Sequence, residues 1–191
     1  MYILITEHQS DFDAVKTIIR RLSGQPELTV KGRGFNGAGE INNKGAVTIQ
    51  SLLTTQTQGC VIVRDCDGID GSQKFKSLKS DVVDKIKTKT KPSFCIVLPR
   101  HELEAWYLAD IKCVTNVWKQ WRPEREFGNP ESYEKAKEEL LKISRTGNLK
   151  PRYSTGDGKN IAMHMDLDVV RKKCPSFGPL YDFITHGKGN V

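Results

Sequence analysis

Short apolar runs alternate with amphipathic helical patterns over the first hundred residues. The apolar runs have the length and composition of strands buried on both faces of a sheet. The strands are expected at 2–5, 27–30, 60–63 and 94–98, and helices between them at 11–22, 43–58 and 72–87. This alternation predicts an α/β fold with a parallel sheet of about four strands and helices on both faces.

The pattern changes after Pro99, because no further strand is indicated. Helical spacing is found at 101–109 and 112–121, a helix starts near Pro130, and short helices follow between 160 and 185. We therefore expect an α/β domain at 1–110 and an α-helical C-terminal extension at 111–191, packed on that domain.

Composition narrows the functional classes. The 191 residues include 30 Lys and Arg against 23 Asp and Glu, a formal net charge of +7. This length excludes a multi-module machine, and the basic excess favours polyanions, above all nucleic acid, as partners. No apolar run reaches the length of a membrane span, so no membrane association is expected. The five cysteines are odd in number and scattered, which indicates free thiols and a cytoplasmic protein.

Acidic residues follow three of the four predicted strands, where open parallel sheets bind their ligands. These residues are Glu7 and Asp11, then Asp65 and Asp67, then Glu102 and Glu104. In an extended chain, Asp65 and Asp67 would project to the same side. Neighbouring carboxylates need a counter-charge, and Mg²⁺ or Mn²⁺ prefers oxygen ligands. The sequence therefore predicts a divalent-metal site at this sheet edge.

The same residues carry a resemblance. The strand-end Glu7 and the later Asp65-Cys66-Asp67 resemble the Toprim domain of topoisomerases, primases and some nucleases, which implies a Toprim or Rossmann-like sheet. The Glu7-x-x-x-Asp11 spacing is similar to that of nucleases of the overcoming-lysogenization-defect type. The segment 100–110, RHELEAWYLAD, resembles the signature of a small Toprim-like bacterial family. One departure from the Toprim pattern is His8, which follows Glu7 at the position where glycine is usual.

The resemblance implies a Mg²⁺-dependent nuclease that cleaves DNA or RNA with one or two metal ions. It also implies a separate ATPase partner and a role in phage defence. In this interpretation one of Glu102 and Glu104 faces the metal, with Glu104 preferred, and Glu7 is a ligand or the general base. The remaining roles are metal ligation by Asp65, Asp67 and Asp11, and neutralisation of phosphate charge by Lys159.

Two other functions stay open. The segment 63–69 also resembles the nucleophile loop of haloacid-dehalogenase-type phosphatases, with Asp65 as nucleophile and a later acidic motif at Asp157. Against it, the motif follows the third strand instead of the first. A non-catalytic Toprim-like scaffold that binds nucleic acid or a partner is the other alternative. The glycines of 32–37 match a nucleotide-binding pattern but follow the second strand, so a solvent loop is expected there.

Overall fold

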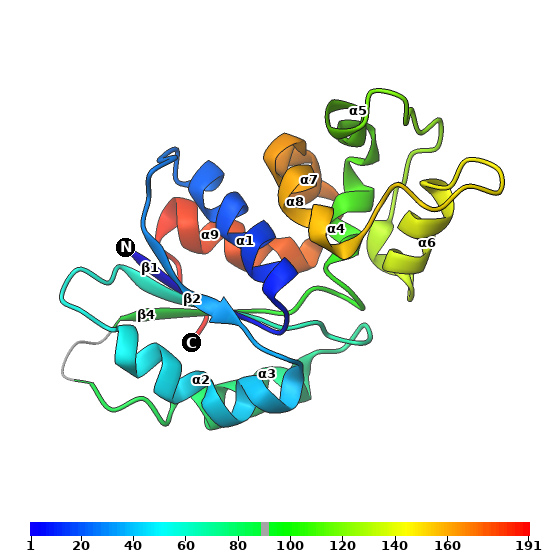
Figure 1. Ribbon diagram of the computed structural model, residues 1–191. Coiled ribbons are helices and arrows are strands. Elements are labelled where there is room, and N and C mark those ends of the chain that lie inside the picture. Colours follow the sequence, from blue (N-terminus) through cyan, green and yellow to red (C-terminus); the bar gives the residue numbers. More distant parts are fainter. Residues whose placement is uncertain (89–91) are drawn as a thin grey trace.

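The computed structural model describes residues 1–88 and 92–191, and it is built around one parallel sheet (Figure 1). The sheet has four strands in the order β2-β1-β3-β4. The strands are β1 (Tyr2–Thr6), β2 (Val30–Gly34), β3 (Gly59–Val63) and β4 (Ser93–Val97). In the register, Thr6 pairs with Val63, and Val63 pairs with Val97. The chain therefore leaves β1, β3 and β4 at one level.

Helices cover both faces of the sheet, as the alternation of strands and helices predicts. On one face lie α1 (Gln9–Leu22) and α9 (Gly178–His186), and on the other α2 (Ala38–Leu52) and α3 (Ser72–Leu78) (Figure 1). Strand residues alternate between the two cores: Leu4 packs on the α1 face and Ile5 on the α2 face. This alternation follows from the two-residue period of a strand.

The chain after β4 is helical among the residues described, in agreement with the sequence pattern. Helices α4, α5 and α6 lie beyond the end of the sheet at which the strand arrows point, and α7 lies along α1 (Figure 1). The bounds are α4 (Glu104–Ala109), α5 (Val114–Val117), α6 (Ala136–Ile143), α7 (Gly158–His164) and α8 (Leu167–Lys173). Single 3₁₀ turns lie at Ile111–Cys113, Pro130–Ser132, Thr155–Asp157 and Pro175–Phe177, and a π-helical turn at Lys79–Val83.

The end of the chain returns to the sheet. Phe183 of α9 meets the ring of Tyr2 edge-on, with 6.0 Å between ring centroids. The Asn190 side chain accepts a hydrogen bond from the Ile96 amide and donates one to its carbonyl, so the tail covers part of the free edge of β4. The apolar core on the α1 face is a single cluster that includes Leu4 of β1 and Ile184 of α9.

The second strand differs from the sequence prediction. It spans Val30–Gly34 instead of 27–30, so Gly32 and Gly34 lie in a strand and not in a solvent loop. Gly32 has a φ of +134°, and a Cβ there would lie 1.7 Å from the Leu4 carbonyl oxygen. A Cβ on Gly34 would lie 2.3 Å from the amide nitrogen of Gln9. These glycines are required for close backbone approach to β1 and α1.

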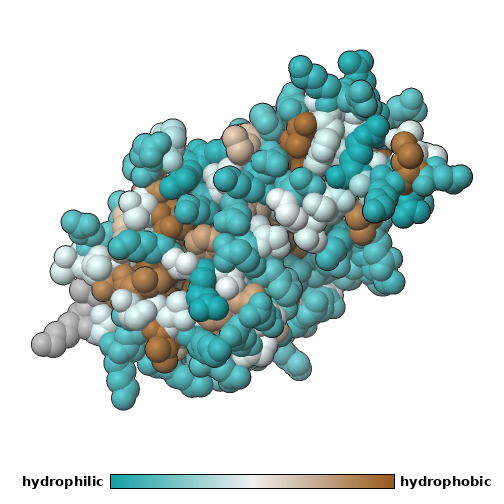
Figure 2. Space-filling view, viewed as in Figure 1, coloured by the Kyte–Doolittle hydropathy of each residue, from teal (hydrophilic) through white to brown (hydrophobic). Residues whose placement is uncertain are grey.

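The surface offers little apolar area in the view of Figure 2, where brown side chains are scattered among hydrophilic ones. All five cysteines are free and buried, as their sequence distribution indicates. Within residues 1–88 and 92–191, no helix combines the length and the apolar character needed to cross a bilayer.

Gly32→Ala tests the close approach of β2 to β1. We expect a loss of unfolding free energy at least ~2 kcal/mol greater than that of Gly37→Ala, because the new methyl group meets backbone. Gly37 is the matched control, since its φ is +100° but no atom lies within 4 Å of its Cβ position. Its own cost should be about 1–2 kcal/mol of backbone strain. Urea unfolding measures both, and equal losses would contradict the close approach.

Candidate functional site

Four acidic side chains lie near one another beyond the carboxyl ends of β1 and β3, close enough for their charges to interact, and we call them the carboxyl cluster: Glu7, Asp11, Asp65 and Glu104. Glu7 follows β1 directly, and Asp65 lies two residues after β3. Asp11 joins them because α1 begins only three residues after β1 ends, and Glu104 is the first residue of α4. The charge of Asp65 interacts with those of the other three. The shared register of the strands therefore concentrates negative charge at one point.

Asp65 is the most strongly affected member. Burial raises its pKa well above the usual value, and the charges of Asp11, Glu104 and Glu7 raise it further. One opposing contact is a hydrogen bond of 3.0 Å from the Leu103 amide to Asp65 Oδ1. This amide holds the carboxyl in place but does not offset three neighbouring carboxylates.

Glu104 is held by a buried tyrosine. The Tyr153 hydroxyl donates a hydrogen bond of 3.0 Å to Glu104 Oε1. Burial raises the pKa of Glu104, and this hydrogen bond partly opposes the rise. The ring of Tyr107 lies beside that of Tyr153, and burial next to Glu104, Asp11 and Asp65 raises the pKa of the Tyr107 phenol. The two phenols therefore form an uncharged wall behind the carboxyl cluster.

A basic side chain lies near each of Asp11 and Glu7. Burial raises the pKa of Asp11, while the charge of His8 lowers it. Arg64 Nε lies 4.0 Å from Glu7 Oε2, beyond hydrogen-bond distance. Both of these atoms are buried, and neither has a hydrogen-bond partner among the described residues. An unpaired buried carboxylate oxygen is costly, so this point favours a further polar or charged ligand.

Asp67 does not join the carboxyl cluster. Its side chain is 70% exposed and forms an ion pair with Lys74. The segment is not extended throughout as expected, because Asp67 has a left-handed backbone with φ of +49°. Its amide donates to the His101 carbonyl at 3.1 Å, which ties the loop after β3 to the loop after β4. The predicted pairing of Asp65 with Asp67 on one side is therefore absent.

Glu102 and Lys159 are not members of the carboxyl cluster, although the charge of Glu102 adds to the rise in the pKa of Glu104 that burial causes. Glu102 Oε2 accepts a hydrogen bond of 2.8 Å from the Lys137 amide in the first turn of α6, a helix-stabilising contact. Lys159 is exposed on α7 and lines a hollow against α1 with Arg20 and Met163. Of the two glutamates that the sequence left open, the structure brings Glu104 to the carboxyl cluster.

Three residues of this site were not among the sequence candidates: Arg64, Tyr107 and Tyr153. Arg64 stands immediately before Asp65, and Tyr107 lies within the segment that resembles the Toprim-like signature, so both had a local signal. The position of Tyr153 depends on how the chain after α6 returns to the site. No local pattern contains that information.

The metal-site prediction stays a prediction. Within residues 1–88 and 92–191, no three His, Cys, Asp or Glu side chains form a group that could hold a metal ion. Mg²⁺ is commonly bound through only one or two carboxylates and keeps several waters. The unpaired Glu7 oxygen and the raised pKa of Asp65 fit such an ion, because a cation would stabilise both charged forms.

The pKa shifts predict how the unfolding free energy of the protein depends on pH when a chelator keeps it free of metal. Because the pKa of folded Asp65 is raised, the folded state keeps a proton that the unfolded chain releases above pH ~4. Unfolding free energy should therefore fall as pH rises through this window. Asp65→Asn should reduce the fall and stabilise the protein on the order of 1 kcal/mol at neutral pH.

Urea unfolding across the acid-to-neutral range measures this difference. Asp13→Asn on α1 is the matched control, since it removes one aspartate that lies outside the carboxyl cluster. If both variants keep the pH profile of the wild type, the account of the carboxyl cluster is wrong.

Comparison with known proteins adds a family but no activity. No curated protein and no solved structure matches the chain significantly. One family model, described as a domain of unknown function (DUF4276), matches residues 2–185. The chain therefore belongs to the DUF4276 family.

Proposed function

We propose that the protein is a metal-dependent phosphodiesterase that cleaves nucleic acid, and that the carboxyl cluster is its active site. The observation that carries the proposal is the meeting of four carboxyl groups beyond the carboxyl ends of β1 and β3, with the pKa of Asp65 raised well above its usual value. Folding has placed like charges together at the edge where parallel sheets bind ligands, and a bound cation would relieve their repulsion.

Asp65 and Glu7 are the residues that would hold Mg²⁺ or Mn²⁺. Such an ion supplies a water of lowered pKa and stabilises charge on phosphate oxygens. Asp11 and Glu104 stand beside these two residues and can accept a proton from an attacking water. Arg64, whose Nε has no hydrogen-bond partner among the described residues, can pair with a phosphate oxygen.

Two observations favour this proposal over the phosphatase. Asp157, the later acidic motif of that alternative, accepts hydrogen bonds from the amide and the hydroxyl of Ser154 and so completes a capping box at the start of the 3₁₀ turn Thr155–Asp157. The second is the net charge of +7, which suits a polymeric phosphate substrate. A separate ATPase partner and a role in phage defence are further proposals that rest on the family resemblance alone.

The metal is tested by thermal and urea unfolding at neutral pH. Mg²⁺ or Mn²⁺ should stabilise the wild type by ~1–3 kcal/mol at concentrations well above the dissociation constant, because the ion binds only the folded chain. Asp65→Asn should lose most of this gain, while Asp13→Asn should keep it. Stabilisation of equal size in all three proteins would show that the carboxyl cluster does not hold the ion.

Activity is tested on single-stranded DNA, duplex DNA and RNA with Mg²⁺ or Mn²⁺. Asp65→Asn and Glu7→Gln should each reduce cleavage at least ~100-fold, since each removes a ligand charge. Asp13→Asn is the control. Asp67→Asn should cut within a few-fold of wild type, because its carboxylate pairs with Lys74 outside the cluster.

Three outcomes would contradict the proposal. Cleavage that survives Asp65→Asn places the chemistry elsewhere. Hydrolysis of phosphomonoesters with an aspartyl adduct on Asp65 identifies the phosphatase. Nucleic-acid binding without cleavage under every metal tested favours the scaffold.

A further inference from the structure

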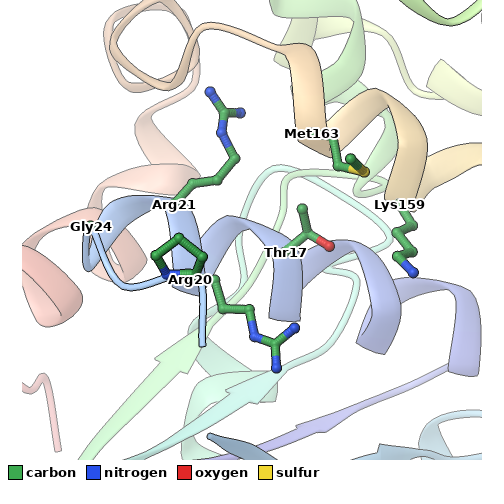
Figure 3. A pocket seen from close by; sticks show the side chains of 7 residues that line it. Thr17, Arg20, Arg21, Gly24, Lys159 and Met163 are labelled. Carbon is green, nitrogen blue, oxygen red and sulfur yellow. The ribbon is translucent and has the colours of Figure 1, made fainter. Parts of the chain in front are cut away.

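A hollow of about 600 Å³ lies between α1 and α7, apart from the carboxyl cluster (Figure 3). Thr17, Arg20 and Arg21 contribute the wall from α1, and Lys159 and Met163 contribute the wall from α7. In Figure 3 the Lys159 side chain descends from α7 toward α1. The charged groups that line the hollow are thus all cations.

The ion pairs among the described residues do not include these cations. Among residues 1–88 and 92–191, no carboxylate forms an ion pair with Arg20, Arg21 or Lys159. Backbone carbonyls hold the two arginines instead. Arg20 Nε donates to the Leu28 carbonyl at 3.1 Å.

Arg21 uses one nitrogen in the same way. Its Nη1 donates to the carbonyls of Ala162 and Met165, at 2.8 and 2.7 Å. A guanidinium has five N–H donors, so both arginines keep donors for a ligand. Their side chains are fixed in advance, which lowers the entropy cost of binding an anion.

The two helices that line the hollow, α1 and α7, start near the carboxyl cluster. Helix α1 carries Asp11 in its first turn, and Arg20 lies nine residues later, about 14 Å along the axis at 1.5 Å per residue. Helix α7 starts at Gly158, where an added Cβ would lie 2.5 Å from the Tyr107 hydroxyl oxygen. Tyr107 itself stands beside the cluster, so α1 and α7 both lead from it to the hollow.

We infer that this hollow binds the phosphate groups of a nucleic-acid strand whose cleavage takes place at the carboxyl cluster. The inference rests on the proposed function, which supplies the strand. Arginine and lysine without acidic partners suit phosphate, and two fixed arginines with a lysine can contact successive phosphates. Met163, which is 51% exposed between them, offers apolar contact to a sugar or an unpaired base.

The test measures binding without cleavage. Fluorescence anisotropy of a labelled single-stranded oligonucleotide is followed in EDTA over a range of salt concentrations. Arg20→Gln/Lys159→Gln should weaken binding about ten-fold and reduce the slope of log affinity against log salt by about 1.4, or 0.7 for each lost phosphate contact.

The control removes the same charge elsewhere. Lys79→Gln/Lys135→Gln takes away two lysines that form ion pairs with Asp84 and Glu138 outside the hollow. It should keep affinity within about two-fold of wild type. Thermal unfolding checks that each protein is folded. If loss of the Arg20 contact unfolds the chain, the single variant Lys159→Glu replaces the double variant. Lys159 is exposed, so this substitution should leave the fold intact and still weaken binding.

The outcomes separate this inference from the proposed function. If folded Lys159→Glu binds the oligonucleotide as tightly as wild type does, the hollow is not the binding site for the strand, even if the wild type cleaves DNA. Weakened binding in a protein that never cleaves supports the hollow and contradicts the nuclease. If a mononucleotide binds as tightly as the oligonucleotide, and the variants weaken both to the same extent, the hollow is a nucleotide site. That result would contradict the inference that it binds a strand.

Discussion

The parallel register of the sheet determines where the acidic side chains of the site lie. Because Thr6, Val63 and Val97 end their strands at one level, the loops that follow β1, β3 and β4 start side by side. The first loop carries Glu7 and the second carries Asp65, and the third leads into α4 with Glu104. Carboxyl groups that repel one another are thereby held together by backbone hydrogen bonds and by the apolar core.

Charge of this kind costs stability unless something offsets it. Burial raises the pKa of Asp65, Asp11 and Glu104, so protonation relieves part of the repulsion. Arg64 approaches Glu7 but stays beyond hydrogen-bond distance. A divalent cation would stabilise the ionised forms more effectively, which explains why we connect this site with metal-dependent chemistry. The unfolding free energy lost to repulsion between the carboxyl groups would then be the cost of a site organised for its ligand.

Much of this arrangement could be predicted from local sequence. Apolar runs located β1, β3 and β4, and the acids that follow these strands include all four members of the carboxyl cluster. Prediction failed where the backbone departs from regular geometry: Asp67 adopts a left-handed conformation, so strand alternation no longer applies. Gly32 belongs to a strand because β1 approaches it closely, a tertiary fact. Tyr153 reaches Glu104 from 49 residues away, and no local pattern contains that contact.

We expect Asp65 and Glu7, and not Asp67, to hold a divalent cation. A crystal structure of the protein soaked in Mn²⁺, with anomalous scattering to identify the ion, tests it most directly. We expect an anomalous peak bonded to carboxylate oxygens of both Asp65 and Glu7, inside the carboxyl cluster. A peak bound at Asp67 beside Lys74, or no peak in the cluster at saturating Mn²⁺, would contradict it.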